Sequence, residues 1–153
     1  MPGLGFRRAA AAMGGILLAA AAPAPAYDFM VDLSFSPKAA ARLQALSEGV
    51  VISAGYYGEP TAAAERHADE VGRVNLGRVE RTVEGPGRAL IRPPAAMGQH
   101  LDWIKGRAVR VELNVYSARR SGPDNILDCS FYDDLLTAAR RAPIPVRCKL
   151  IGE

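Results

Sequence analysis

The sequence is poor in the residues and motifs that carry chemistry. It has two histidines, two cysteines and one tryptophan. It contains no Gly-x-Ser-x-Gly elbow, no glycine-rich phosphate loop, no His-Glu-x-x-His pair and no Cys-x-x-Cys spacing. These absences remove the usual sequence grounds for a hydrolase, a phosphate-loop enzyme, a zinc protease or a thiol oxidoreductase. No cofactor is predicted, and an enzyme with an unrecognised site remains an alternative.

The chain also lacks an apolar run long enough to span a bilayer, which takes about 20 mostly apolar residues. The basic pair Arg7-Arg8 precedes a shorter stretch of alanine, leucine and isoleucine, and Ala-Pro-Ala stands immediately before Tyr27. This is the pattern of a cleavable signal peptide over residues 1–26. It predicts a periplasmic or secreted protein with no stable membrane span after cleavage. The arginine pair leaves twin-arginine export open, but the alanines after it favour the ordinary secretory route.

An excess of charge of one sign is missing once the signal peptide is removed. Arg7 and Arg8 are its only charged residues, so 19 basic side chains become 17 against 16 acidic ones, and the formal charge falls from +3 to +1. A near-neutral domain with scattered arginines gives no support for nucleic-acid binding. We therefore expect no nucleic-acid partner.

Residues 27–153 are predicted to form a single β-rich domain, because no repeat or long linker divides them. Strict apolar alternation marks strands near residues 27–35, 50–56, 109–115 and 144–150. Shorter strands are expected between glycine and proline turns. The pattern predicts a mainly β fold, an antiparallel β-sandwich of seven or eight strands with one or two short helices, and resembles immunoglobulin-like or transthyretin-like sandwiches.

The segments between the strands are predicted to be short helices and crossings. Ser36 and Pro37 have the residue types of a helix start, which predicts a helix over residues 37–47. A second helix is predicted from Asp133 to Arg141, with an aspartate as its cap. Residues 61–70 have no large apolar side chain and are expected to be a surface helix or a mobile excursion without core contacts. Residues 95–105 are expected to cross from one sheet to the other.

Two cysteines occupy the apolar phase of their strands. Cys129 and Cys148 can meet if these strands pair or face each other, and in an oxidising compartment such a pair is usually a disulfide. A redox-active or metal-binding pair is the weaker alternative because the Cys-x-x-Cys spacing is missing.

Only weak signals point to a metal. Met97 and His100 combine a thioether with an imidazole, ligands that suit copper in an exported protein, and a periplasmic copper-binding protein is therefore one alternative function. Two ligands do not complete a site, and Met30 is a candidate third. His67 lies among carboxylates, where a solvated charged surface explains the pattern more simply.

A recognition surface is the leading functional hypothesis. Tyrosines near strand ends often build such surfaces, and loops carry many binding residues. The candidate residues are Tyr116, Arg119, Arg120, Asp124 and Asn125. The sequence thus predicts an exported, non-catalytic binding or interaction module with an unknown protein or small-molecule partner.

Overall fold

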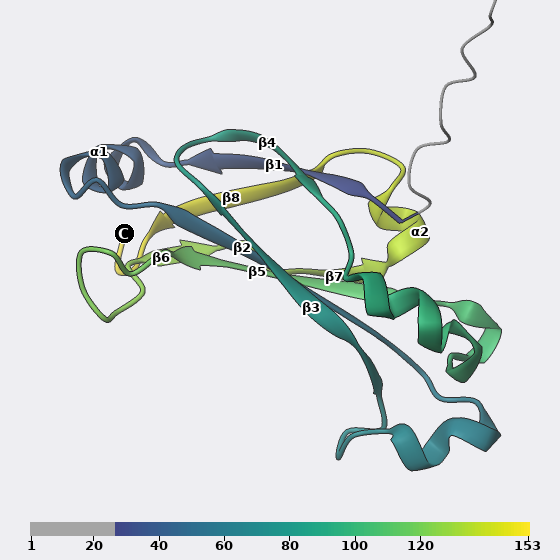
Figure 1. The fold of residues 1–153 in the computed structure, drawn as a ribbon. Helices are drawn as coiled ribbons and strands as arrows, with labels where there is room; N and C mark the ends of the chain where they lie inside the picture. The colour runs from purple at the N-terminus through teal and green to yellow at the C-terminus, as the bar shows by residue number, and fades with distance from the viewer. Residues whose placement is uncertain (1–26) are drawn as a thin grey trace, which may run out of the picture.

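The computed structural model describes residues 27–153, which form two four-stranded sheets joined by short helices (Figure 1). The first sheet has the strand order β4-β1-β8-β6 and the second the order β3-β2-β5-β7. The strands are β1 (Phe29–Phe35), β2 (Val50–Gly58), β3 (Val74–Val83), β4 (Gly87–Ile91), β5 (Arg110–Ser117), β6 (Leu127–Cys129), β7 (Tyr132–Leu135) and β8 (Ile144–Leu150). The mainly β, two-sheet prediction is confirmed. The predicted signal peptide lies outside the described residues.

Alternating side chains from both sheets fill one hydrophobic core, as the sequence periodicity predicts. The inward positions of β1 and β8 come from the first sheet, and those of β2 and β5 from the second. The buried hydrophobic residues of these four strands are Phe29, Val31, Leu33, Val50, Ile52, Ala54, Tyr56, Val111, Leu113, Val115, Ile144, Val146 and Cys148. The intervening positions of β2 and β5 face away from the core, so their side chains can build a surface.

In the part of the chain that the structure describes, the strand pairs are antiparallel with one exception. β1 and β8 are parallel neighbours, with Val31 beside Ile144 and Phe35 beside Cys148. In the second sheet, β2 pairs with both β3 and β5 over nearly its whole length. A register shift lies opposite Gly77, where the chain has a positive φ of 109°. A glycine within an alternating strand sequence predicts such a break in register, and the prediction is confirmed at Gly77.

The first helix, α1 (Pro37–Ala45), begins where its capping residues predict. The Ser36 hydroxyl accepts a hydrogen bond from the Ala39 amide at 3.1 Å and donates one to the Glu153 carboxylate at 2.7 Å. The helix ends two residues before the predicted boundary. Ala39 and Leu43 face the core, which orients α1 across the end of the first sheet.

Within residues 27–153, three 3₁₀ segments lie at the end of the domain opposite α1 (Figure 1); η1 joins β2 to β3 of the second sheet, and the other two connect the sheets. They are η1 (Ala62–His67), η2 (Ala95–Trp103) and η3 (Lys105–Arg107). The predicted crossing at residues 95–105 is confirmed, since η2 and η3 join β4 of one sheet to β5 of the other. The sequence predicts that residues 61–70 contribute nothing to the core. This prediction is wrong at Ala64, which is buried, with 2% of its surface exposed.

The chain between residues 127 and 141 differs from its predicted structure. The alternation of Leu127, Cys129 and Phe131 predicts one continuous strand, but β6 ends at Cys129 and Phe131 is 66% exposed. The next strand, β7, belongs to the other sheet. The prediction of a helix from Asp133 to Arg141 is wrong at its start, because Asp133 lies in strand β7, where it pairs with Glu112 of β5. Within this range the α-helix is α2 (Leu136–Ala139). Strand pairing with β5 outweighs the local capping signal.

The predicted disulfide is confirmed. Cys129 on β6 and Cys148 on β8 are direct antiparallel partners, and their sulfur atoms are bonded. Cys148 is 3% exposed and belongs to the core. The disulfide therefore links the short edge strand β6 to its neighbour β8 in the same sheet. It does not bridge the two sheets of the sandwich.

Candidate functional site

The predicted recognition residues begin on the outer face of β5. The Tyr116 hydroxyl donates a hydrogen bond to Glu80 on β3 at 2.8 Å. Arg119 has a positive φ of 60°, and its guanidinium lies 5.4 Å from the centroid of the Tyr116 ring. These two predicted residues therefore lie together, at a distance suited to a cation–π contact.

Arg120 ties the loop after β5 to the turn between β3 and β4. Its guanidinium donates two hydrogen bonds to the Glu84 carboxylate, at 2.8 and 2.6 Å. The same guanidinium covers Gly49, where a Cβ atom would lie 3.0 Å from the Arg120 Cζ. This bidentate pairing with Glu84 fixes the direction of the Arg120 side chain along the rim of the sandwich.

The remaining two predicted residues differ in their surroundings. Asn125 is turned toward the backbone: its side-chain oxygen accepts hydrogen bonds from the amides of Ser117 and Leu127, and its nitrogen donates to the Leu127 carbonyl. Its polar atoms are thus used in holding the loop. Asp124 is exposed, and among residues 27–153 its side chain makes no hydrogen bond or ion pair.

Glu48 anchors this loop, although no motif in the sequence predicts a role for it. It is 4% exposed, and its carboxylate accepts hydrogen bonds from the backbone amides of Gly49, Arg120 and Ser121 and from the Ser121 hydroxyl. Burial alone would raise its pKa, but the hydrogen bonds outweigh burial and hold the pKa below its ordinary value. Its partners Arg120 and Ser121 lie 72 and 73 positions away in the chain, so no local pattern distinguishes Glu48 from a surface glutamate.

A hollow of about 530 Å³ opens between α1, the β3–β4 turn and this loop. We call it the loop-end hollow. Apolar side chains and the Arg120–Glu84 ion pair both contribute to its wall. The lining includes Phe35, Ala40, Leu43, Glu84, Pro86 and Arg120. Of the five predicted recognition residues, Arg120 is the one that lines it.

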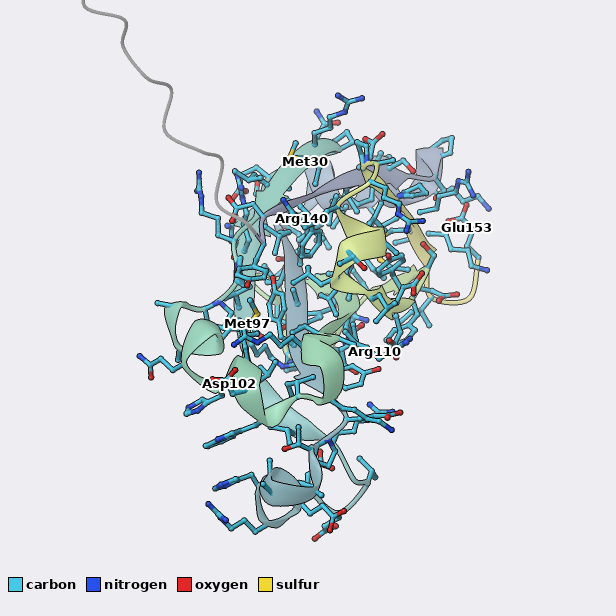
Figure 2. The ribbon with its side chains drawn as sticks, turned by 90° about the vertical axis from the view of Figure 1, so that its right-hand side faces the viewer. Met30, Met97, Asp102, Arg110, Arg140 and Glu153 are labelled. Carbon is cyan, nitrogen blue, oxygen red and sulfur yellow. A yellow bond between two sulfur atoms is a disulfide. The ribbon has the colours of Figure 1, made fainter. Side chains whose placement is uncertain are left out.

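A second polar cluster joins β2, β5 and β7 on the solvent face of the second sheet. The Tyr57 hydroxyl lies 2.8 and 2.6 Å from the two Asp133 carboxylate oxygens, to which it donates. Arg110, labelled in Figure 2, donates to the Asp133 carboxylate at 2.9 Å and to the Tyr57 oxygen at 3.1 Å. The strand register brings the three together, since Tyr57 pairs with Arg110 and Asp133 with Glu112.

The electrostatics of this cluster favour a rigid wall over proton transfer. Burial and the hydrogen bond to Asp133 raise the pKa of Tyr57, so the phenol stays protonated. Burial would raise the pKa of Asp133, but the hydrogen bonds from Tyr57 and Arg110 lower it overall. Each group therefore keeps its ordinary charge at neutral pH, whereas a general acid or base needs a pKa near the working pH.

Met97 and His100, the predicted copper ligands, have different surroundings. Met97 is 1% exposed and packs in the core beneath η2 (Figure 2). The His100 ring stacks on Trp103 with centroids 4.0 Å apart, and His67 stacks on the same indole at 3.9 Å. The stack joins η1 to η2. Copper binding by Met97 and His100 stays a prediction.

The part of the chain from residue 27 onward has no cluster of three or more histidine, cysteine, aspartate or glutamate side chains placed to hold a metal ion. Over the same residues, no helix has the length and apolar character needed to cross a membrane. The chain matches no protein-family model, and comparisons with curated proteins and with solved structures give no significant match. The functional argument therefore depends on the geometry of the sites themselves.

Proposed function

We propose that residues 27–153 form an exported, non-catalytic binding module that takes its ligand in the loop-end hollow. The observation that carries this proposal is the hollow of about 530 Å³ beside Arg120. Ligand sites are typically concave, about 300–1,000 Å³ in volume, and mainly apolar with a few fixed polar groups. Phe35, Leu43 and Pro86 supply apolar surface, and Arg120 with Glu84 supplies charges of both signs at the rim.

The surroundings of the hollow support binding over catalysis. Glu48, the buried carboxylate at its wall, is fully engaged by backbone amides and has a lowered pKa, which suits an anchor better than a proton carrier. The anchored loop holds the Arg120 backbone in one place. A pre-organised wall reduces the entropy lost when a ligand binds.

Export is proposed on two grounds. Residues 1–26 have the basic start, apolar stretch and small-x-small end of a signal peptide. The Cys129–Cys148 disulfide is the kind of bond that persists in oxidising compartments. We accordingly propose a periplasmic or secreted location for the working domain.

The test is a fragment screen by NMR on the ¹⁵N-labelled protein purified after export. We expect fragments that join an apolar group to a carboxylate to shift the amide signals of Leu43, Glu84 and Arg120. The variant Ala40→Trp fills the hollow and should abolish these shifts. Ala41→Trp is the matched control, because residue 41 is also exposed on α1 but does not line the hollow.

A protein partner is tested with the same pair of positions. A photo-crosslinking residue at position 40 should capture a defined partner in the exporting cell, and one at position 41 should capture much less of it. Fragment binding that survives in Ala40→Trp, or crosslinks of equal strength from both positions, would count against the loop-end hollow as the binding site.

A further inference from the structure

A second hollow lies at the other end of β2, away from the loop-end hollow. It has a volume of about 450 Å³ and is bounded by strands β2, β5 and β7 and by the turn before β3. We call it the Tyr57 hollow. Its lining includes Tyr57, Glu59, Val71, Arg73, Arg110 and Asp133. Four of these side chains carry a formal charge, so its chemistry is governed by how those charges are already paired.

Two of the four charges are used within the protein. Arg110 and Asp133 are paired with each other at 2.9 Å, and the Tyr57 hydroxyl also donates to Asp133. Burial opposes the charged carboxylate, but these hydrogen bonds lower the Asp133 pKa overall and keep it ionised. This trio therefore forms a fixed, locally neutral wall of the hollow.

Arg73 supplies a positive charge with unused hydrogen-bond donors. Its guanidinium lies 4.5 Å from the centroid of the Tyr57 ring, which fixes its position by a cation–π contact. Its nearest carboxylate oxygen, on Glu112, is 3.9 Å away, and that carboxylate already receives a hydrogen bond from Arg78 at 3.0 Å. Within residues 27–153 the Arg73 guanidinium makes no hydrogen bond, and the side chain is 45% exposed.

Glu59 supplies the opposite charge. It is exposed at the end of β2, where its backbone carbonyl accepts a hydrogen bond from the Lys105 amide at 2.9 Å. Across the described part of the chain, its carboxylate takes part in no ion pair or hydrogen bond. Val71, which is 72% exposed, adds an apolar side chain to the lining.

We propose that the Tyr57 hollow is a second binding site, specific for a small zwitterion of the α-amino acid type. The Arg73 guanidinium receives the carboxylate through paired N–H donors, and the Glu59 carboxylate receives the ammonium group. An aliphatic side chain lies against Val71. This arrangement gives hydrogen-bond partners to the two charged side chains of the hollow that make no hydrogen bond within residues 27–153, while the Tyr57, Arg110 and Asp133 wall keeps its own bonds.

The experiment uses three matched probes and the protein purified after export. L-Leucine carries both charges, 4-methylpentanoate lacks the ammonium group, and 3-methylbutylamine lacks the carboxylate. Isothermal titration and NMR should give a Kd for leucine of about 1 mM or tighter, with each single-charge analogue weaker by about tenfold, the size of one charge-assisted hydrogen bond. NMR shifts should centre on Val71 and Arg73.

Two variants separate the two charges. Arg73→Gln should make leucine bind no better than 3-methylbutylamine, and Glu59→Gln should make it bind no better than 4-methylpentanoate. Arg66→Gln and Glu65→Gln, on the exposed face of η1, are matched controls and should leave the Kd unchanged. The proposal is overturned if leucine does not bind, if either analogue binds as tightly as leucine, or if the controls weaken binding as much as the site variants.

Discussion

The hydroxyl of Tyr57 lies 2.6 Å from a carboxylate oxygen of Asp133, although 76 positions separate the two residues in the chain. Arg110, on the strand between them, binds both. This contact ties β2, β5 and β7 together on the solvent face of the second sheet. It also reinforces β7, a four-residue edge strand whose register is otherwise set by its pairing with β5.

Asp133→Asn should destabilise the domain by about 1–2 kcal/mol at pH 7, the range for hydrogen bonds to a charged group with some solvent screening. The folded pKa of Asp133 is lowered, so its contribution is complete above the unfolded pKa of about 3.9. It declines as the pH falls below that value toward the folded pKa. Urea unfolding of both proteins from pH 7 to pH 3 should show the stability difference shrinking below about pH 4.

Asp134→Asn is the control for this change, because the Asp134 side chain is exposed and, within residues 27–153, accepts a hydrogen bond only from the neighbouring Leu135 amide. At pH 7, Asp134→Asn should lower the free energy of unfolding by less than Asp133→Asn does. An Asp133→Asn variant as stable as the Asp134→Asn variant would show that the contact with Tyr57 and Arg110 contributes nothing to the fold.

The adjacent tyrosines of β2 should respond in opposite ways to loss of the hydroxyl. Tyr56 is 1% exposed and its hydroxyl has no hydrogen-bond partner within the described residues, so Tyr56→Phe should be neutral or slightly stabilising. Tyr57→Phe should cost about 1 kcal/mol, because it removes a donor to Asp133. Thermal and urea unfolding of the two variants measure this contrast, and a larger loss for Tyr56→Phe would contradict it.

Glu48→Gln should loosen the loop after β5. An amide nitrogen cannot accept, so at least one of the backbone donors of Gly49, Arg120 and Ser121 loses its partner in a buried place, at a cost of about 2–3 kcal/mol. Hydrogen exchange should show faster exchange of the Arg120 and Ser121 amides. Glu84→Gln, which removes the exposed partner of Arg120, should leave the exchange of the Ser121 amide unchanged; equal effects from both variants would refute the anchoring role of Glu48.

Removing the disulfide should lower the stability by roughly 3 kcal/mol, the chain-entropy value for a closed loop of about 20 residues. The variant carries Cys129→Ala and Cys148→Ala together, because alanine leaves no polar group in the buried position of Cys148. Urea unfolding compares it with the oxidised and the reduced wild-type protein. The reduced protein should resemble the double variant, and a reduced protein as stable as the oxidised one would contradict the prediction.

The sequence predicted the parts of the fold that depend on local periodicity. Alternation located β1, β2, β5 and β8, and the pair Ser36-Pro37 located the start of α1. The candidate sites were predicted less well. The loop and strand-end patterns indicate Arg120 and Tyr116, whereas Glu48 and Arg73 have no immediate neighbours that distinguish them from ordinary surface residues. The local pattern places Asp133 at a helix start, which hides its contact with Tyr57.

The sequence by itself determined which residues face inward, since the two-residue period of a strand and the 3.6-residue period of a helix are local properties. It also determined that the two cysteines could meet. Only the tertiary structure decided that β6 and β7 belong to different sheets and that Asp133 lies in a strand. The physical reason is that strand pairing and buried polar contacts join residues far apart in the chain, so their energies override local capping and helix preferences.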